Sequence, residues 1–241
     1  MSWTEVKIAL NSTLGTNEFA PLNRIIEDAQ YENYYNTFAA NVDMLGDNGG
    51  RIIIVPRSSK ILEEQYKDVS AFAIILPPEL KEIGQLAFLN SFIKTAVIPN
   101  NVTDIGMAAF ESCSKLINVK IGNGVNLIDQ FAFSDCNHLK SIIIPNNVKT
   151  LKRSIFLRCS SMEEAVIGNG IIEIPNAIFM DCTSLSKITI SSAIQNVGEN
   201  AFSGCSALSD VYYGGTEEQW RAIDVAAGND NLLGATIHYN S

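Results

Sequence analysis

The sequence has few charged residues and no basic cluster. Of its 241 residues, 18% are Asp, Glu, Lys or Arg, and the formal net charge is −9. The phosphates of nucleic acids and the headgroups of anionic lipids both attract clustered Lys and Arg. We therefore expect neither a nucleic-acid partner nor docking on an anionic membrane surface.

Long apolar segments are missing as well. No run of about twenty apolar residues is present, so we expect no membrane insertion, although the 46% apolar content is ample for a continuous core. Residues 1–15 carry polar and acidic groups where a signal peptide has its apolar region. The sequence thus predicts a cytoplasmic chain by default. A cell-surface or secreted location is the alternative, if the chain is truncated or is exported by another route.

The residue patterns of common catalytic sites are absent too. The only histidines are His138 and His238, which are far apart in the sequence. No G-x-S-x-G, H-E-x-x-H or G-x-x-x-x-G-K segment is present. These segments would indicate a hydrolase nucleophile, a zinc protease or a phosphate-binding loop. We expect no catalytic residue, no metal and no cofactor, and an enzyme remains only a third class of function.

The chain is built instead on a repeat of 23 residues. Cysteine recurs at positions 113, 136, 159, 182 and 205, and phenylalanine at positions 110, 133, 156, 179 and 202. An L-x-x-I-x-I order with a period in the twenties is typical of leucine-rich repeats. The first well-formed repeat is one residue shorter and has Ser91 close to the cysteine position. The sequence predicts a right-handed leucine-rich-repeat solenoid, an α/β repeat fold with a parallel β-sheet on its concave face.

The register of the repeat predicts eight strands, each followed by a turn. They lie near residues 52–55, 73–76, 95–98, 118–121, 141–144, 164–167, 187–190 and 210–213. Turns such as Gly122-Asn123-Gly124 normally indicate a hairpin. Here each strand must pair in parallel with the strand one repeat later, because the units are related by translation. These turns are therefore expected to be corners of the solenoid.

The chain divides into three segments. These are an N-terminal helical cap or attachment module, the solenoid, and a C-terminal capping unit, at residues 1–50, 51–214 and 215–241. Pro21 is a good first-turn residue for a helix in the first segment. In the last segment, Thr216 and Gln219 form a capping-box pattern for a short helix that carries Trp220, and residues 235–239 are expected to form a final strand.

Two sequence phrases resemble a known family. The order I-x-I-P-x-x-V-x-x-I-G-x-x-A-F-x-x-C resembles the BspA-like leucine-rich repeats of bacterial and some protozoan proteins. The closing V-Y-Y-G-G-T-E-E-Q-W, followed by A-T-I-H-Y-N, resembles the usual C-terminal unit of such arrays. The resemblance covers about residues 51–241. It implies a non-enzymatic interaction protein, often at a cell surface and sometimes linked to adhesion.

The cysteines invite a metal or disulfide interpretation, since neighbouring sulfurs would lie about one strand spacing apart. A tetrahedral zinc site needs converging ligands, and a linear ladder does not converge. Five thiols cannot all pair within one chain. We therefore interpret them as small buried hydrophobic residues beside the phenylalanines.

Alternation along each strand separates core residues from outward ones. It sends Val119 and Ile121 into the core and leaves Asn118 and Lys120 outside. One outward set, which we call the apolar column, consists of Ile75, Val97, Lys120, Ile143, Val166, Thr189 and Tyr212. The set beside it, the polar column, consists of Ala73, Thr95, Asn118, Ser141, Glu164, Lys187 and Asp210.

Exposed apolar residues in such a column can mark a binding surface. Alternatively, β-branched residues are there because they suit a pleated sheet. The candidate binding residues are Ile75, Val97, Lys120, Ile143, Glu164, Val166, Lys187, Thr189, Asp210 and Tyr212. The predicted function is binding of a protein partner, such as a host or cell-surface protein, or of a glycan or host matrix, through the concave sheet. The alternative is a structural spacer that displays residues 1–50.

Overall fold

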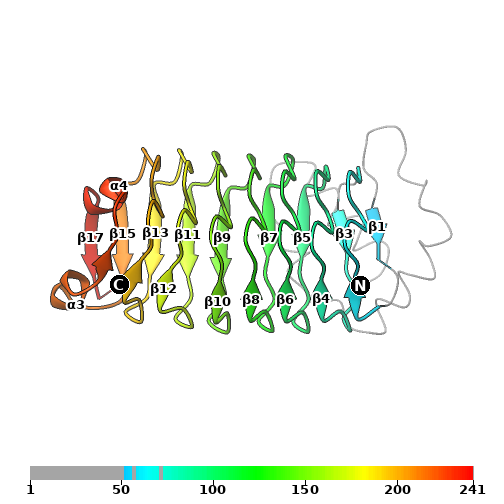
Figure 1. The fold of residues 1–241 in the computed structure, drawn as a ribbon, viewed down its shortest axis with the longest axis horizontal. Helices are drawn as coiled ribbons and strands as arrows, with labels where there is room; N and C mark the ends of the chain where they lie inside the picture. The colour runs from blue at the N-terminus through cyan, green and yellow to red at the C-terminus, as the bar shows by residue number, and fades with distance from the viewer. Residues whose placement is uncertain (1–51, 56–57, 71–72, 241) are drawn as a thin grey trace, which may run out of the picture.

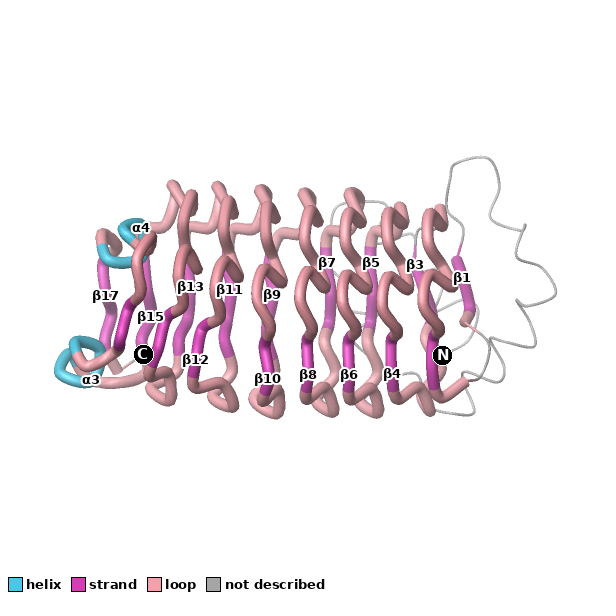
Figure 2. The backbone as a smooth tube through the Cα atoms, in the orientation of Figure 1, coloured by secondary structure: helices cyan, strands magenta, loops and turns pink. Residues whose placement is uncertain are grey.

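The structure is a computed structural model that describes residues 52–55, 58–70 and 73–240, with the side chains of residues 52–54, 73 and 75 left out of the description. The described chain winds into a solenoid of stacked coils (Figure 1). Each regular coil contributes one strand of three or four residues to a long sheet and one two-residue strand on the other side of the coil (Figure 2). The helices predicted within residues 1–50 lie outside the described residues.

The long sheet has nine parallel strands in sequence order. They are β1 (Ile52–Ile54), β3 (Ala73–Ile75), β5 (Thr95–Val97), β7 (Asn118–Lys120), β9 (Ser141–Ile144), β11 (Glu164–Ile167), β13 (Lys187–Ile190), β15 (Asp210–Tyr213) and β17 (Thr236–Tyr239). All eight strands of the repeat register and the final strand are thus confirmed. The turns after β1 to β15 lead to the other side of the coil rather than to an antiparallel partner, and all pairing in the long sheet is parallel, as the translation of the repeat requires.

Short strands on the other side of the coils were not predicted. Five of them form one parallel sheet: β2 (Lys60–Ile61), β4 (Glu82–Ile83), β6 (Asp104–Ile105), β8 (Leu127–Ile128) and β10 (Thr150–Leu151). Three more form another: β12 (Glu173–Ile174), β14 (Asn196–Val197) and β16 (Asp224–Val225). Each regular coil therefore pairs with its neighbours along two separate lines.

A proline lies at the point where the short strands divide into two sheets. The Gly198 N–H, which follows β14, donates a hydrogen bond to the carbonyl oxygen of Ile174 at 2.7 Å. Pro175 occupies the same position one coil earlier and has no N–H to donate. The carbonyl of Leu151 therefore receives no such bond, and the ladder is interrupted between β10 and β12.

Between the short strand and the cysteine, each coil turns without forming a helix. In one coil Phe131 and Asp135 both adopt left-handed backbone angles, with φ of 59°. Their N–H groups donate to Arg153 and Leu157 of the next coil at 3.4 and 2.8 Å. Because these donors point along the solenoid axis, the backbone is satisfied by the neighbouring coil rather than within one turn of helix.

A stack of aromatic rings runs through the core. Each neighbouring pair lies 5.0 to 5.7 Å apart between ring centroids. The rings belong to Tyr66, Phe88, Phe110, Phe133, Phe156, Phe179 and Phe202. The six phenylalanines are fully buried. The rings are thus a continuous packing column that ties successive coils together.

The five cysteines are free, buried and hydrogen-bonded. The thiol of Cys136 donates to the carbonyl oxygen of Phe110 at 3.2 Å, and that of Cys205 donates to Phe179 at 3.1 Å. In the shorter coil, the Ser91 hydroxyl makes the equivalent bond to Tyr66 at 2.8 Å. The cysteines are therefore core residues, as predicted, and each also supplies a donor that bridges two coils.

The C-terminal end departs from the repeat. Helix α3 (Glu217–Arg221) begins at Thr216, whose capping box with Gln219 is present as predicted. Trp220 on this helix packs edge-on against Tyr213, with ring centroids 5.2 Å apart. Helix α4 (Asp230–Leu233) follows β16. Both helices lie at the C-terminal end of the solenoid (Figure 1). None of the helices in the described part of the chain is long and apolar enough to cross a membrane.

Candidate binding surface

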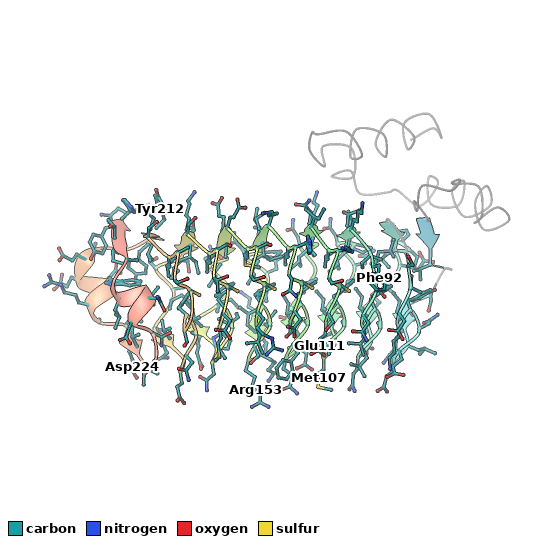
Figure 3. The ribbon with its side chains drawn as sticks, turned by 90° about the horizontal axis from the view of Figure 1, so that it is seen from above. Phe92, Met107, Glu111, Arg153, Tyr212 and Asp224 are labelled. Carbon is teal, nitrogen blue, oxygen red and sulfur yellow. The ribbon has the colours of Figure 1, made fainter. Side chains whose placement is uncertain are left out.

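Strand register places the predicted apolar column in one line across the long sheet. Ile143 pairs with Val166, Val166 with Thr189, and Thr189 with Tyr212. Val97 pairs with Lys120 nearer the N-terminus. Ile75 lies in β3. Tyr212 projects from the side of the long sheet, whereas Met107 and Arg153 project from the opposite side (Figure 3). The strand register thus makes Val97 a neighbour of Lys120, and it places Ile143, Val166, Thr189 and Tyr212 in one line.

The exposure of this column follows the alternation of the strands. Ile142 and Ile144 are buried, while Ile143 between them is 65% exposed. Lys120 is exposed, and Val166 and Tyr212 are half-buried. An isoleucine that is two-thirds exposed on a sheet face contributes little to the core, so its apolar surface is available to another molecule.

The polar column carries an alternation of charge. Glu164 lies 2.8 Å from the Nζ of Lys187, and this carboxylate raises the pKa of Lys187 by a hydrogen bond and by its charge. Asp210 lies one strand further on. Hydrogen bonds from His238 and Ser209 lower the pKa of Asp210. The charges are mutually satisfied across the strands, so these residues form a polar border to the apolar column rather than isolated charges.

Thr95 differs from the other members of the polar column. Its side chain is only 2% exposed, and its Oγ1 has no hydrogen-bond partner within the described part of the chain. Sequence alternation predicted an outward residue here.

His238 is a member of the surface that the sequence analysis missed. It pairs with Tyr212 in the strand register, and the two rings stack with centroids 4.5 Å apart. Its Nε2 lies 2.7 Å from Asp210 Oδ1. The signal was present in the predicted final strand, because extending the column by one strand leads to this residue.

Tyr212 is held between two side chains. Lys187, from the strand on one side, lies over its ring at 5.0 Å from the centroid. His238 stacks on it from the strand on the other side. Cation–π contact and stacking therefore occupy the two ring faces, and the phenol presents its edge and its hydroxyl group.

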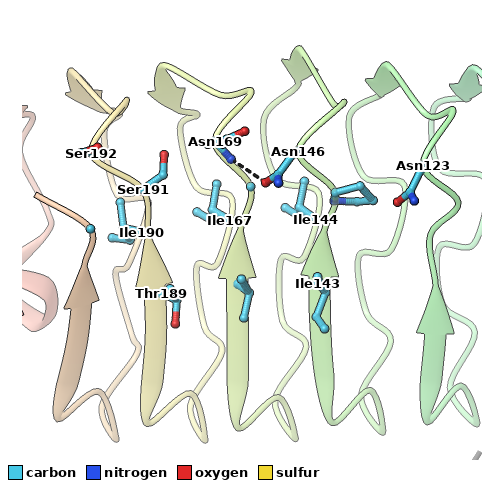
Figure 4. Close-up of a pocket in the computed structure, with 14 residues that line it drawn as sticks. Asn123, Ile143, Ile144, Asn146, Ile167, Asn169, Thr189, Ile190, Ser191 and Ser192 are labelled. Carbon is cyan, nitrogen blue, oxygen red and sulfur yellow. Dashed lines mark hydrogen bonds between the residues drawn. The ribbon is translucent and has the colours of Figure 1, made fainter. Parts of the chain in front are cut away.

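A shallow hollow of about 520 Å³ lies beside the apolar column (Figure 4). Ile143, Val166 and Thr189 line it from the strands. Asn123, Asn169 and other turn residues line it from the solenoid corners that follow the strands. A second hollow of about 350 Å³ lies next to it and includes Val97, Lys120 and Ile143. The exposed Ile143 thus borders both hollows.

The shape of the corner depends on alternating residues. Coils with Pro99 or Pro145 alternate with coils that have Gly122 or Gly168 at the same position. A Cβ on Gly168 would come within 2.7 Å of the carbonyl oxygen of Pro145, and one on Gly122 within 2.4 Å of that of Pro99. These coils therefore require glycine at this position, because a Cβ would clash with the backbone of the neighbouring coil.

Asparagines in the proline-bearing coils hold the corners together. The Asn169 N–H donates to Asn146 Oδ1 at 3.0 Å (Figure 4). The Asn123 N–H donates to Asn100 Oδ1 at the same distance. The side chains of Asn123 and Asn169 are exposed and make no hydrogen bond within the described residues. Asn146 is exposed as well and uses only its Oδ1 in the bond from Asn169, so side-chain amides are presented on three successive coils.

Ionisable residues gather nowhere on the described chain in the arrangement that a metal ion would need. Among the residues that the structure describes, no three His, Cys, Asp or Glu side chains form such a group. Ser209 donates to Asp210, and Asp210 contacts His238. In this order the hydroxyl faces the carboxylate instead of the imidazole, so the three residues do not make a nucleophile–base pair.

Comparison with known proteins adds a family and a fold. Residues 50–163 and 115–221 match the family described as BspA type leucine rich repeat region, with six copies of the repeat. The solved structure of the T. pallidum leucine rich repeat protein (TpLRR) is 21% identical to this chain, with a TM-score of 0.56. The match covers 77% of this chain and 93% of that chain. At this identity the likeness shows a shared solenoid fold.

Two further solved structures are similar over shorter parts of their length. A leucine rich cell surface protein from Faecalibacterium prausnitzii A2-165 is 23% identical, with a TM-score of 0.40, and the match covers 73% of this chain and 63% of that one. The pneumococcal vaccine antigen PcpA is 16% identical, with a TM-score of 0.43 and coverage of 69% and 62%. No curated protein matches the chain.

Proposed function

The chain belongs to the BspA-type leucine-rich repeat family, and from this premise we propose that it binds a protein partner through the outer face of its nine-stranded sheet. Repeat solenoids present extended surfaces on which binding residues are placed coil by coil. The observation that carries the proposal is the 65% exposure of Ile143, which is aligned with Val166 and flanked by the charged polar column. An apolar centre with a polar border is the usual anatomy of a protein interface.

The two parts of this face have different roles. Ile143 and Val166 supply apolar area that is removed from water when a partner binds, which is the main source of affinity. Glu164, Lys187 and Asp210 select the partner's complementary charges and affect the rate of association more than affinity. Because these charges are already paired across the strands, we expect them to contribute modestly.

Affinity capture with a matched control tests this proposal. The intact chain, the double variant Ile143→Glu/Val166→Glu and the variant Ile172→Glu are immobilised and exposed to the same bacterial and host lysates. Ile172 is 59% exposed but lies next to the short strand β12, outside the long sheet. Its substitution therefore controls for the effect of adding a carboxylate to exposed apolar surface. The expected result is a protein that the intact chain and Ile172→Glu retain and that the double variant loses.

The folded state of each variant is checked by circular dichroism and thermal unfolding. A double variant that folds normally and retains the same proteins as the intact chain would contradict binding through this face. If the intact chain retains no protein at all, the spacer interpretation is favoured. The spacer alternative is supported by the continuous stack of aromatic rings from Tyr66 to Phe202, because packing along the whole axis favours a stiff solenoid.

A further inference from the structure

The charges along the outer face of the long sheet change sign halfway along the solenoid. Three lysines and no acidic residue occur in the segments that contain β5, β7 and β9, which are residues 94–98, 117–121 and 140–144. Three acidic residues and one lysine occur in the equivalent segments of the next three coils, which are residues 163–167, 186–190 and 209–213. The face therefore has a positive half and a negative half, which meet between β9 and β11.

Apolar surface lies at the boundary between the two halves. Ile143 in β9 is 65% exposed and pairs with Val166 in β11. At the rim of the face, Lys140 comes just before β9 and forms an ion pair at 2.7 Å with Glu163, which comes just before β11. A surface with opposite charges on the two sides of an apolar centre is complementary to a copy of itself that is reversed along the axis.

We propose that this face binds a second copy of the chain, face to face and with the two solenoid axes antiparallel. The inference rests on the proposed function, because it names the partner that the same sheet face binds. The twofold axis runs parallel to the strands and passes between β9 and β11, so that β9 of each copy lies over β11 of the other. The charges, the apolar centre and the area of the face support this arrangement.

Reversal of one copy brings opposite charges together. Lys140 of each copy lies opposite Glu163 of the other, so the two ion pairs form a square in which each charge has an opposite charge on two sides. Lys94, just before β5, faces the coil that carries Asp210. Lys187, the lysine of the negative half, is already held by Glu164 at 2.8 Å. Two copies with parallel axes would instead place the positive halves over each other, which costs free energy.

The apolar centre is the second support. In the antiparallel arrangement Ile143 of each copy covers Val166 of the other, so two apolar contacts form beside the twofold axis. Removal of this apolar surface from water is favourable, and the ion pairs at the rim surround it. An apolar centre inside a charged rim is the usual order of a protein interface.

The shape and area of the face set the strength of the contact. The solenoid runs straight in Figures 1 and 3, so two outer faces can meet over several coils. Sheets that pack face to face lie about 10 Å apart, a distance that lysine and glutamate side chains at the rim can bridge together. Six coils at about 4.8 Å and five residues at about 3.3 Å give roughly 500 Å² on each copy. Because about 1,000 Å² in total is at the low end for specific interfaces, we expect a weak, reversible dimer.

Sedimentation equilibrium of the full chain over a range of concentrations is the direct test. The intact chain should show a reversible monomer–dimer equilibrium with a dissociation constant in the micromolar range. Lys140→Glu and Glu163→Lys each place like charges opposite one another across the twofold axis, so each variant alone should associate about tenfold more weakly or worse. An intact chain that stays monomeric at every concentration overturns the inference.

An equimolar mixture of these two variants separates a contact between copies from an effect within one copy. The first variant carries glutamate at both positions and the second carries lysine at both, so a mixed dimer has opposite charges in both contacts. Association should therefore return in the mixture. A defect in the folding of either variant would not be corrected by mixing. A mixture that associates as weakly as its two components overturns the inference.

Lys60→Glu is the matched control for the change of net charge. Lys60 pairs with Glu82 at 2.6 Å between the short strands β2 and β4, on the other side of the coil. Its reversal should leave the dissociation constant of the dimer unchanged. Equal weakening by Lys60→Glu and Lys140→Glu would show that net charge, rather than this face, governs association, and would overturn the inference.

Capture from lysates keeps the inference apart from the proposed function. A monomeric chain that captures another protein through Ile143 overturns the inference and leaves the proposed function standing. A dimer that persists in Ile143→Glu/Val166→Glu and in both charge variants uses another face, and this result also overturns the inference. Absence of both self-association and capture overturns both.

Discussion

The thiol of Cys159 donates a hydrogen bond to the carbonyl oxygen of Phe133 in the preceding coil, with 3.1 Å between sulfur and oxygen. The same contact recurs at every cysteine, and Ser91 makes it with a hydroxyl group in the one well-formed coil that lacks a cysteine. The position therefore requires a small buried donor. Cysteine meets that need and also fills more apolar volume than serine.

A pair of variants separates the donor from the packing. Cys159→Ala removes the bond and some volume, and we expect a loss of about 1 to 3 kcal/mol in the free energy of unfolding. Cys159→Ser keeps a donor in the geometry that Ser91 already uses, so its loss should be smaller. Denaturant titration of both variants gives the comparison. An alanine variant at least as stable as the serine variant would show that the hydrogen bond contributes nothing.

Thiol reactivity should depend on folding and on pH. Burial raises the pKa of Cys159 and Cys182 far above the ordinary value, and that of Cys205 to about 12. In the folded protein we expect no reaction with a thiol reagent at neutral pH, and five reacting thiols after denaturation under non-reducing conditions. Fewer than five would indicate a disulfide.

These raised pKa values also make stability depend on pH. The unfolded thiols ionise near their ordinary value of 9.0, whereas the folded ones stay neutral. Their contribution to stability is therefore complete below pH 9 and is lost as pH rises from there through the folded pKa, about 12 for Cys205. Chemical denaturation at a series of pH values should show this decline, and a flat profile up to pH 11 would contradict it.

The sequence located the long sheet because its repeated strands alternate core and outward residues, and β9, β11, β13 and β15 each bury two residues. The short strands bury one residue in two, as in Asp104–Ile105, and this leaves too little pattern to recognise. The interruption at Pro175 depends on one missing donor, and the corner hollow depends on which turn residues contact the next coil. Alternation predicted the apolar column, but the contacts on both faces of Tyr212 come from neighbouring strands.

Phe88 illustrates the same limit. Its repeat is less regular than the later ones, so the sequence alone predicts that truncating Phe88 costs less than truncating Phe156. In the structure its ring lies between Tyr66 and Phe110, at 5.3 and 5.0 Å, and is as buried as that of Phe156. We therefore expect Phe88→Ala and Phe156→Ala to cost similar amounts, about 3 to 5 kcal/mol each. A much smaller loss for Phe88→Ala in urea titration would contradict this.

The corner glycines provide a matched pair for steric fit. Gly168 and Gly214 occupy equivalent positions two coils apart. A Cβ on Gly168 would meet backbone oxygens at 2.7 Å, whereas one on Gly214 would have its nearest contact at 3.4 Å. Gly168→Ala should therefore destabilise the protein by about 1 to 3 kcal/mol, and Gly214→Ala should have little effect. Thermal unfolding of both variants provides the measurement, and equal losses would show that the corner can relax.

Arg158 and Asp135, on neighbouring coils, form a two-point ion pair, with both nitrogen–oxygen distances 2.7 Å. The hydrogen bond from Arg158 lowers the pKa of Asp135 below its ordinary value of 3.8. A carboxyl group with a lowered folded pKa stabilises the fold above its ordinary pKa and loses that contribution as pH falls through the folded pKa. Arg158→Ala should therefore cost about 0.5 to 1 kcal/mol at pH 7, because the pair is partly exposed, and the difference from the parent should disappear in strong acid.

Lys140→Ala removes a single exposed contact with Glu163, also at 2.7 Å, and serves as the control with almost no expected loss. Urea titrations at pH 7 and at pH 3 or below compare the three proteins, and an Arg158→Ala penalty that stays constant into strong acid would show that packing of the arginine side chain, rather than its charge, stabilises this contact.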